Sequence, residues 1–223
     1  IRFGDNDRLA ALVAHLVGAE LLVLLTDTAG LFTADPRLDA TASLVEEVSE
    51  VDAALERAAG GPGTPGGSGG MASKLAAARM AAWSGVRTVI AAAARDGVLV
   101  GAVAGEPGIG THVAARERTL GARKLWIAFA LRAAGRVTVD DGARRALVER
   151  EASLLPAGVR SVEGDFVVEE AVEIAGPDGK VFAKGLAGLP SRSSTLWMGR
   201  KSPELPGELA RELVHRDDLV VLV

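Results

Sequence analysis

The N-terminal part of the chain combines a helical pattern with a short, wholly apolar run. In residues 7–17 (DRLAALVAHLV), leucine and valine recur at helical spacing, and Asp5 or Asn6 stands where an N-cap belongs. LLVLLT follows at 21–26 and is ended by the polar TDTAG. A continuous apolar run of this length is typical of a strand that is buried on both faces of a parallel sheet, so we expect a central strand here.

The same succession of elements returns further along the chain. A second helix is predicted over about 52–59, and a third over 72–84 with Gly85 as its C-terminal stop. VRTVIAAAA at 86–94 predicts another buried strand. Helices that alternate with apolar strands predict a layered α/β domain.

The character of the sequence changes near residue 133. The helical GARRALVERE and the strand-like VVEEAVEIA and KVFAKGLA, of which the last two are joined by Pro177-Asp178-Gly179, predict a small β-rich domain with a hairpin. We therefore expect an α/β domain at 1–115, a linker at 116–132 and a β-rich domain at 133–223.

Composition narrows the classes of function. The 223 residues are 48% hydrophobic, include no cysteine and carry a formal net charge of −4. This charge gives no general attraction to nucleic acid or membranes, and the lack of cysteine excludes thiol chemistry and suits the cytoplasm. No apolar run reaches the roughly 18 residues of a membrane span, and IRFGDND does not resemble a signal peptide. Because Ile1 is not methionine, we expect a native start to precede it.

Residues 60–74, GGPGTPGGSGGMASK, place glycine and proline directly before the third predicted helix. The glycines match GxGxxG, but the segment follows a helix rather than a strand, which argues against a dinucleotide-binding fingerprint. Ser73 stands before Lys74 where a P-loop needs glycine. The bare backbone can still approach an anion, and a helix N-terminus and Lys74 add positive charge. The alternative is a flexible surface linker.

Four sequence blocks occur in an order and at a spacing that point to one known family. They are FGDNDRLAALVA (3–14), LLTDTAGLFTADPR (24–37), GGSGGMASKLAAARMA (66–81) and RKLWIA (123–128). Together they resemble the glutamate 5-kinases, which use ATP to phosphorylate the side-chain carboxylate of L-glutamate in the first step of proline biosynthesis. The resemblance implies the C-terminal half of an amino acid kinase three-layer α/β/α domain at 1–115. DDGARRAL, SLLPAGV, GDF and the pair Ser193-Ser194 resemble an appended PUA domain.

The resemblance also implies roles for individual residues. Asn6 would bind L-glutamate, while Asp5 and Asp7 would be catalytic acidic groups that organise the site and hold a hydrated magnesium ion. Thr26 and Asp27 would contact ATP. The loop that closes over the ATP phosphates would comprise Ser68, Gly69, Gly70, Met71, Ala72, Ser73 and Lys74, of which Lys74 would also be catalytic.

Departures from the family pattern are few. Ala29 stands where the family usually carries a polar or acidic residue, which puts one contact beside the nucleotide in doubt. Ser68 and Ser73 replace threonines and keep the hydroxyl group.

The implied reaction needs no general base. The glutamate side chain has an ordinary pKa of about 4.3 and is already ionised at neutral pH. The obstacle is repulsion between anions, which lysine, Mg²⁺, helix N-termini and loop amides would reduce. No zinc site is expected, because His15, His112 and His215 lack paired ligand spacing.

The C-terminal domain raises a second class of function, because PUA domains elsewhere bind RNA. Residues 133–223 hold 12 Lys and Arg against 15 Asp and Glu, a net charge of −3, which does not support RNA binding. Assembly into a homo-oligomer and feedback inhibition by proline stay open. The sequence is also compatible with a different acyl-phosphate-forming amino acid kinase, or with an inactive fragment that binds through its PUA domain. The N-terminal half of the kinase domain has no counterpart here, so we expect this chain alone to be inactive.

Overall fold

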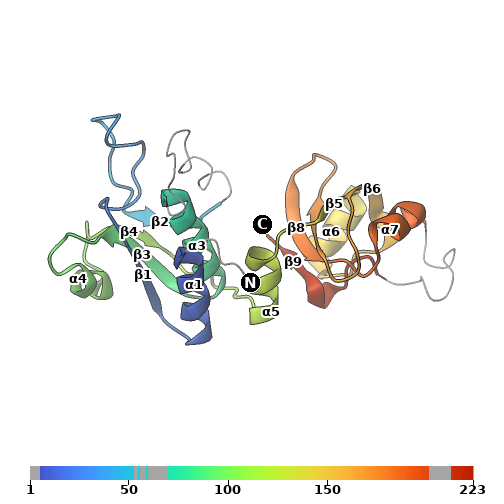
Figure 1. The fold of residues 1–223 in the computed structure, drawn as a ribbon, viewed down its shortest axis with the longest axis horizontal. Helices are drawn as coiled ribbons and strands as arrows, with labels where there is room; N and C mark the ends of the chain where they lie inside the picture. The colour runs from blue at the N-terminus through green and yellow to red at the C-terminus, as the bar shows by residue number, and fades with distance from the viewer. Residues whose placement is uncertain (1–5, 53–54, 56–58, 60–69, 201–211, 223) are drawn as a thin grey trace. The chain divides into compact units, whose positions relative to one another are not determined.

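A computed structural model of the chain describes residues 6–52, 55, 59, 70–200 and 212–222. The chain divides into two compact units, Ile1–Ala122 and Arg123–Val223, and each is described by itself (Figure 1). In the part of the chain that is described, no helix has the length and apolar character needed to cross a membrane.

A four-stranded mixed sheet forms the centre of the first unit. Its strands, in order across the sheet, are β1 (Leu21–Thr26), β3 (Arg87–Ala92), β4 (Thr111–Val113) and β2 (Glu47–Val48). β1 is parallel to β3, β3 is antiparallel to β4, and β4 is parallel to β2. Helices α1 (Asn6–Leu16) and α3 (Met71–Trp83) lie side by side on one face, and α4 (Val98–Ala104) lies on the other (Figure 1).

Side chains of β3 alternate between these two faces. The cluster beneath α4 consists of Val89, Ala91, Val98, Ala102 and Ile109. Thr88 and Ile90 point to the opposite face, where eight of the thirteen residues of α3 are buried. Four of those eight are alanines, and their small side chains let α3 pack closely against both the sheet and α1.

Helices α1 and α3 end in the same glycine motif. Gly18 (φ 64°) and Gly85 (φ 80°) adopt the left-handed conformation that glycine reaches at least cost. The N–H groups of Gly85 and Val86 donate to carbonyls in the last turn of α3, at 3.0 and 2.9 Å, and those of Gly18 and Ala19 do so in α1, at 3.2 and 2.9 Å. This is the Schellman pattern, which confirms the predicted stop at Gly85 and turns each helix directly into a strand.

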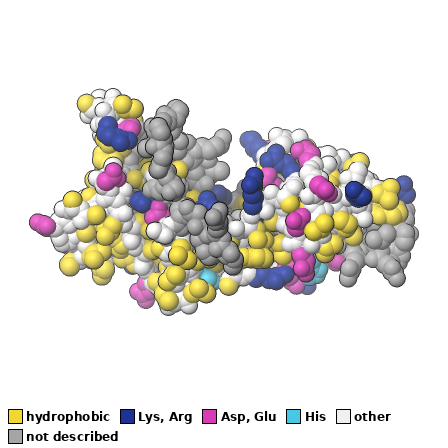
Figure 2. Space-filling model, in the orientation of Figure 1, with side chains coloured by type: hydrophobic (Ala, Val, Ile, Leu, Met, Phe, Trp, Pro, Cys, Tyr) yellow, Lys and Arg dark blue, Asp and Glu magenta, His cyan; other side chains and the backbone are white. Residues whose placement is uncertain are grey.

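β1 is an edge strand rather than a central one. Within the described residues it pairs with β3 alone; of its six residues only Leu24 is buried, and Leu25 is 42% exposed. The expected central position of LLVLLT is therefore not seen within the described residues. α4 covers one face of β1, against Leu21 and Val23, and α1 and α3 cover the other, but its outer edge has no partner strand there. Hydrophobic side chains are also exposed on the surface of this unit (Figure 2), including several on α1 and α4.

A five-stranded sheet forms the second unit. Its order is β6 (Val159–Gly164), β5 (Gly135–Val139), β7 (Ala171–Ala175), β8 (Val181–Leu186) and β9 (Leu219–Val221). β5 and β7 are parallel, and the other neighbours are antiparallel. The hairpin predicted at Pro177-Asp178-Gly179 is confirmed between β7 and β8. Helices α6 (Asp141–Arg150) and α7 (Ser191–Trp197) complete the unit; Asp140 caps α6 by accepting a hydrogen bond from the Ala143 N–H at 2.8 Å.

Part of the range 116–132, expected to be a linker, is helical. α5 (Ala122–Leu125) continues into a five-residue π-helix (Trp126–Ala130) in which Ile127 is fully buried. The ammonium group of Lys184, on β8, donates to the carbonyls of Ala128 (3.3 Å) and Leu131. Carbonyls at a helix end lack helical donors, so this largely buried lysine holds the π-helix against the sheet.

Candidate functional site

The N-terminal ends of α1 and α3 lie at the end of the sheet where β1 and β3 finish. Each helix turns through its glycine motif into the next strand, so helix and strand run in opposite directions in adjacent layers (Figure 1). In α/β folds, ligands bind at the carboxyl ends of the strands. Helix N-termini add partial positive charge at the same end, which favours an anionic ligand.

Asp7 in the first turn of α1 forms an ion pair with Lys74 in the first turn of α3. The Nζ of Lys74 lies 3.1 Å from Oδ2 and 3.2 Å from Oδ1 of Asp7. Both side chains are largely buried, at 10% exposed for the lysine and 16% for the aspartate. The Ser73 hydroxyl donates to Oδ2 of Asp7 at 2.8 Å. One carboxylate therefore holds a hydroxyl and an ammonium group of the following helix in place.

The first amides of α3 have no side-chain cap. Gly70 is the N-cap residue, in extended conformation (φ −72°, ψ −177°), and has no side chain that could accept a hydrogen bond. Its carbonyl accepts from the N–H groups of Ser73 (3.0 Å) and Lys74 (3.3 Å). The amides of Met71 and Ala72 come before the first helical bond and have no hydrogen-bond partner among the described residues. Amides at this position of a helix bind phosphate and other anions.

Thr26 and Asp27 stand at the carboxyl end of β1. The Thr26 hydroxyl donates to Oδ1 of Asp27 at 3.1 Å, and Asp27 is exposed. Next in the chain, the Thr28 hydroxyl donates to the Gly30 carbonyl at 3.2 Å. These short-range bonds order the turn that follows β1, and they leave the Asp27 carboxylate open to solvent.

Beyond this turn, residues 31–45 form a ribbon that leaves the sheet and returns to it. At its tip, Arg37 donates to Asp35 through Nε (3.1 Å) and Nη2 (3.0 Å). Side-chain hydrogen bonds from Arg37, together with a bond from its backbone amide, lower the pKa of Asp35. The hydroxyl and the amide of Thr41 lower the pKa of Asp39 in the same way. Both carboxylates therefore stay ionised to lower pH, and the charge of Arg37 is paired.

The predicted site residues fall into two groups at this end of the unit. Contacts join Asp7 with Ser73 and Lys74, and join Thr26 with Asp27. The predicted residues that are described are Asn6, Asp7, Thr26, Asp27, Gly70, Met71, Ala72, Ser73 and Lys74, whereas Asp5, Ser68 and Gly69 lie outside the described residues. The roles of all of them stay predictions. Asp7 and Lys74 are 67 residues apart, and sequence reasoning did not anticipate their pairing.

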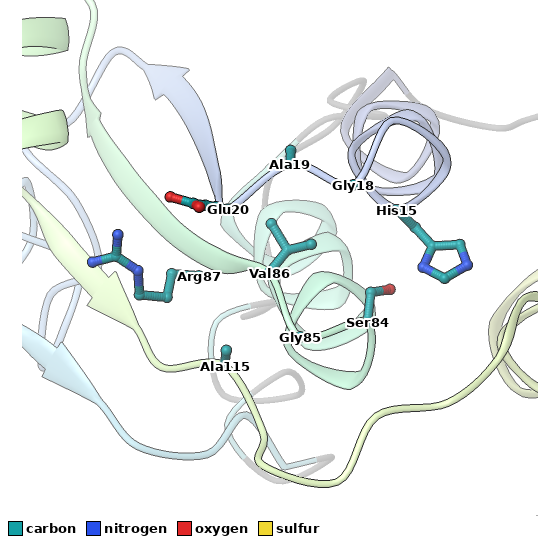
Figure 3. Close-up of a pocket in the computed structure, with 9 residues that line it drawn as sticks. All are labelled: His15, Gly18, Ala19, Glu20, Ser84, Gly85, Val86, Arg87 and Ala115. Atoms are coloured by element: carbon teal, nitrogen blue, oxygen red, sulfur yellow. The ribbon is translucent and has the colours of Figure 1, made fainter.

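A cavity of about 540 Å³ opens at the opposite end of the first unit. Figure 3 shows it between the turns that follow α1 and α3, with His15, Glu20, Ser84 and Arg87 among its lining residues. None of the predicted site residues lines it. We therefore place the candidate site at the helix N-termini, where the charged and hydroxyl groups are held together, and not in this cavity.

No group of three or more His, Asp or Glu side chains is arranged to hold a metal ion in the described part of the chain. A hydrated magnesium ion requires only one or two carboxylates when it arrives with phosphates. Asp27 could hold such an ion, because its carboxylate is exposed to solvent. In this structure Asp7 does not, because Lys74 and Ser73 occupy both of its oxygens.

The two units match two separate family models. Residues 1–92 match the amino acid kinase family, and residues 135–207 match the PUA domain. The chain therefore combines an amino acid kinase α/β fold with a PUA domain, as the sequence blocks predicted.

Over its full length the chain is similar to proteins named glutamate 5-kinase. It is 46% identical to the one from Mycobacterium avium (strain 104) over 222 residues, which are 100% of this chain and 59% of that relative. It is 49% identical to the one from Nitrosomonas eutropha over 226 residues, covering 100% of this chain and 60% of the relative. The predicted resemblance is confirmed, and the chain spans about three fifths of these relatives' length. Among solved structures it is similar to an isopentenyl phosphate kinase (24% identity, TM-score 0.37, 49% of this chain and 37% of the other).

Proposed function

We propose that this chain is part of an enzyme that transfers the γ-phosphoryl group of ATP to the side-chain carboxylate of L-glutamate, giving L-glutamyl 5-phosphate and ADP. One observation carries the proposal: Lys74 is held by Asp7 at the N-terminal ends of two helices, in a chain 46% to 49% identical to glutamate 5-kinases. On this assignment the enzyme acts in the first step of proline biosynthesis, in the cytoplasm.

The residues at the helix ends suit the electrostatics of this reaction. The acceptor carboxylate and the phosphates are all anionic, so the barrier falls when positive charge surrounds the transferred group. Lys74 supplies a full charge, and the amides of Met71 and Ala72 at the start of α3 supply partial ones. Asp7 keeps the ammonium group in a single position, so little ordering is needed when the substrates bind.

Asn6 and the pair Thr26-Asp27 would hold the two substrates. The amide of Asn6 is exposed at the start of α1 and can donate to a carboxylate and accept from an ammonium group, as an amino acid requires. Thr26 and Asp27 lie at the carboxyl end of β1, which suits contacts with the nucleotide. When bound with ATP, Mg²⁺ would neutralise phosphate charge, with Asp27 positioned to hold it through its carboxylate.

The second unit has a different role in this proposal. Several of its arginines are paired with carboxylates, including Arg136 with Glu173 (2.7 Å) and Arg160 with Asp140 (2.9 Å). Residues 133–223 also carry a net charge of −3, so the unit as a whole does not attract the phosphates of a nucleic acid. We therefore assign the PUA domain to assembly of a homo-oligomer or to regulation, with proline as the candidate feedback inhibitor, and not to RNA binding.

The test is a hydroxamate assay for acyl phosphate, with ATP and Mg²⁺, on the chain and on a version extended at its N-terminus to the length of its relatives. L-glutamate, L-aspartate and N-acetyl-L-glutamate are compared as acceptors. We expect turnover with L-glutamate in the extended protein. Turnover with one of the other acceptors alone would assign a different amino acid kinase, and no turnover with any of them would contradict the proposal.

A further inference from the structure

The ribbon 31–45 is fastened to the sheet at its base by one buried hydroxyl group. Thr111 is the first residue of β4, is paired with Ile90 of β3 and has no exposed surface. Its Oγ1 accepts a hydrogen bond from the Leu31 N–H at 2.8 Å and donates one to the Val45 carbonyl at 2.7 Å. The hydroxyl thus acts both as an acceptor and as a donor. It accepts at Leu31, where the first leg of the ribbon begins, and donates at Val45, where the second leg ends.

The legs are also bonded to each other, which makes the hydroxyl part of a closed arrangement. The Val45 N–H donates to the Leu31 carbonyl at 2.8 Å. Leu31 is 5% exposed, so its amide has no water to replace a lost partner. Removal of the hydroxyl would leave the buried Leu31 N–H without an acceptor and the partly buried Val45 carbonyl without this donor.

The turn after β1 lies directly against this hydroxyl. Gly30 has a φ of 154°, and a Cβ at this position would come within 2.6 Å of Thr111 Oγ1. The Gly30 carbonyl is bonded in turn to the Thr28 hydroxyl. Only three residues therefore separate Leu31, which Thr111 holds, from the exposed carboxylate of Asp27.

We propose that Thr111 is a positioning residue for the nucleotide site: its hydroxyl fixes the backbone at Leu31 and so orients the turn that carries Thr26 and Asp27. This inference rests on the proposed function, because it takes that turn to contact ATP. A serine at this position keeps both hydrogen bonds. A valine has the shape of threonine and makes neither bond.

The chain provides a matched control. Thr88 lies on the adjacent strand β3 and is as buried as Thr111, at 1% exposed. Its Oγ1 has no hydrogen-bond partner among the described residues. Thr88→Val therefore makes the same chemical change at the same depth of the same sheet without removing a bond.

The experiment measures the dissociation constant of a fluorescent ATP analogue and the rate of hydrogen exchange at the Leu31 amide. Both are measured at a temperature well below the unfolding midpoint of each variant. We expect Thr111→Val to weaken nucleotide binding at least tenfold and to speed exchange at Leu31 at least tenfold. Thr111→Ser and Thr88→Val should stay within threefold of the parent in both measurements. In the extended protein, the KM for L-glutamate should not change in Thr111→Val.

Other results would contradict the positioning role of Thr111. Parent-like nucleotide binding by a folded Thr111→Val protein would remove the positioning role, as would unchanged exchange at Leu31. If Thr111→Val does not fold, Thr111→Ser decides, since a tenfold loss of binding with the hydroxyl retained would contradict the inference and parent-like binding would support it. No saturable nucleotide binding by the parent in its extended form would contradict the proposed function, and the positioning role with it.

Discussion

Breaking the ion pair between Asp7 and Lys74 should destabilise the first unit more than any surface pair can. At the 3.1 Å separation of Nζ and Oδ2, the attraction between two unit charges is about 5 kcal/mol at an effective dielectric constant of about 20. Desolvation of both groups offsets part of this attraction. Asp7→Ala leaves the Lys74 ammonium 10% exposed with no counter-charge from Asp7, so we expect a loss of about 2 to 4 kcal/mol in the free energy of unfolding.

A double-mutant cycle isolates the energy of the pair. The parent, Asp7→Ala, Lys74→Met and the double variant are unfolded in urea, and Trp83 fluorescence reports on the first unit. Trp126 and Trp197 belong to the second unit, so Phe replaces both in all four proteins. Asp7→Ala and Lys74→Met remove the same attraction. The sum of their losses in the free energy of unfolding should therefore exceed the loss in the double variant by at least about 1 kcal/mol.

The exposed pair of Asp35 and Arg37 is the control. Its side chains are 35% and 76% exposed, and the same cycle should give no measurable coupling, because solvent screens the two charges. A coupling at Asp7 and Lys74 as small as that of the control would refute the argument that Asp7 holds the lysine in place.

Four further outcomes are expected. In an extended, active protein, Lys74→Ala should lower kcat about a hundredfold with little change in the KM for L-glutamate, since its charge acts mainly on the transition state; steady-state kinetics at saturating ATP would expose an unchanged kcat. Asn6→Ala should raise the KM for L-glutamate by about one to two decades and leave ATP affinity unchanged, and titration of each substrate separates the two. Gly85→Ala should lower the free energy of unfolding in urea by about 1 to 2 kcal/mol, because the left-handed φ of 80° strains alanine and its Cβ would meet a neighbouring side chain at 2.8 Å. Gly97→Ala, at a φ of 69° with open space around the residue, should lower it less. Residues 133–223 carry more acidic than basic groups, so in the full chain a gel shift with structured RNA should detect only weak association that salt abolishes.

The elements of the first unit that could be predicted are those with a strong local signal. The helical spacing in DRLAALVAHLV and the glycines that follow α1 and α3 define Asn6–Leu16 and Met71–Trp83 to within a residue. The apolar runs define β1 at its observed bounds and β3 to within two residues, because hydrophobic periodicity and stop residues are local properties of the chain.

The arrangement of the sheet could not be predicted in the same way. β2 has two residues and β4 has three, too few to establish a period of two, so the antiparallel step from β3 to β4 carried no signal. The edge position of β1 depends on which strands are its neighbours, and an apolar run does not encode that. For the candidate site, the sequence predicted which residues take part but not which of them are in contact. The contacts join Asp7 to Lys74 and Leu31 to Thr111 over 67 and 80 residues, so they depend on tertiary packing.

The glycine motifs that end α1 and α3 have a consequence for how the chain tolerates change. Asp7 precedes Gly18 by eleven residues, and Lys74 precedes Gly85 by eleven. The strands β1 and β3, which follow the two glycines, begin side by side in the sheet. Asp7 and Lys74 therefore lie at the same distance along their helices from the start of these strands, about three helical turns away. One residue inserted within either helix would rotate its charged group by about 100° and separate the pair. An insertion between β1 and α3 would leave this distance unchanged, so we expect length variation among homologues to collect in the loops and to be absent from these two eleven-residue intervals.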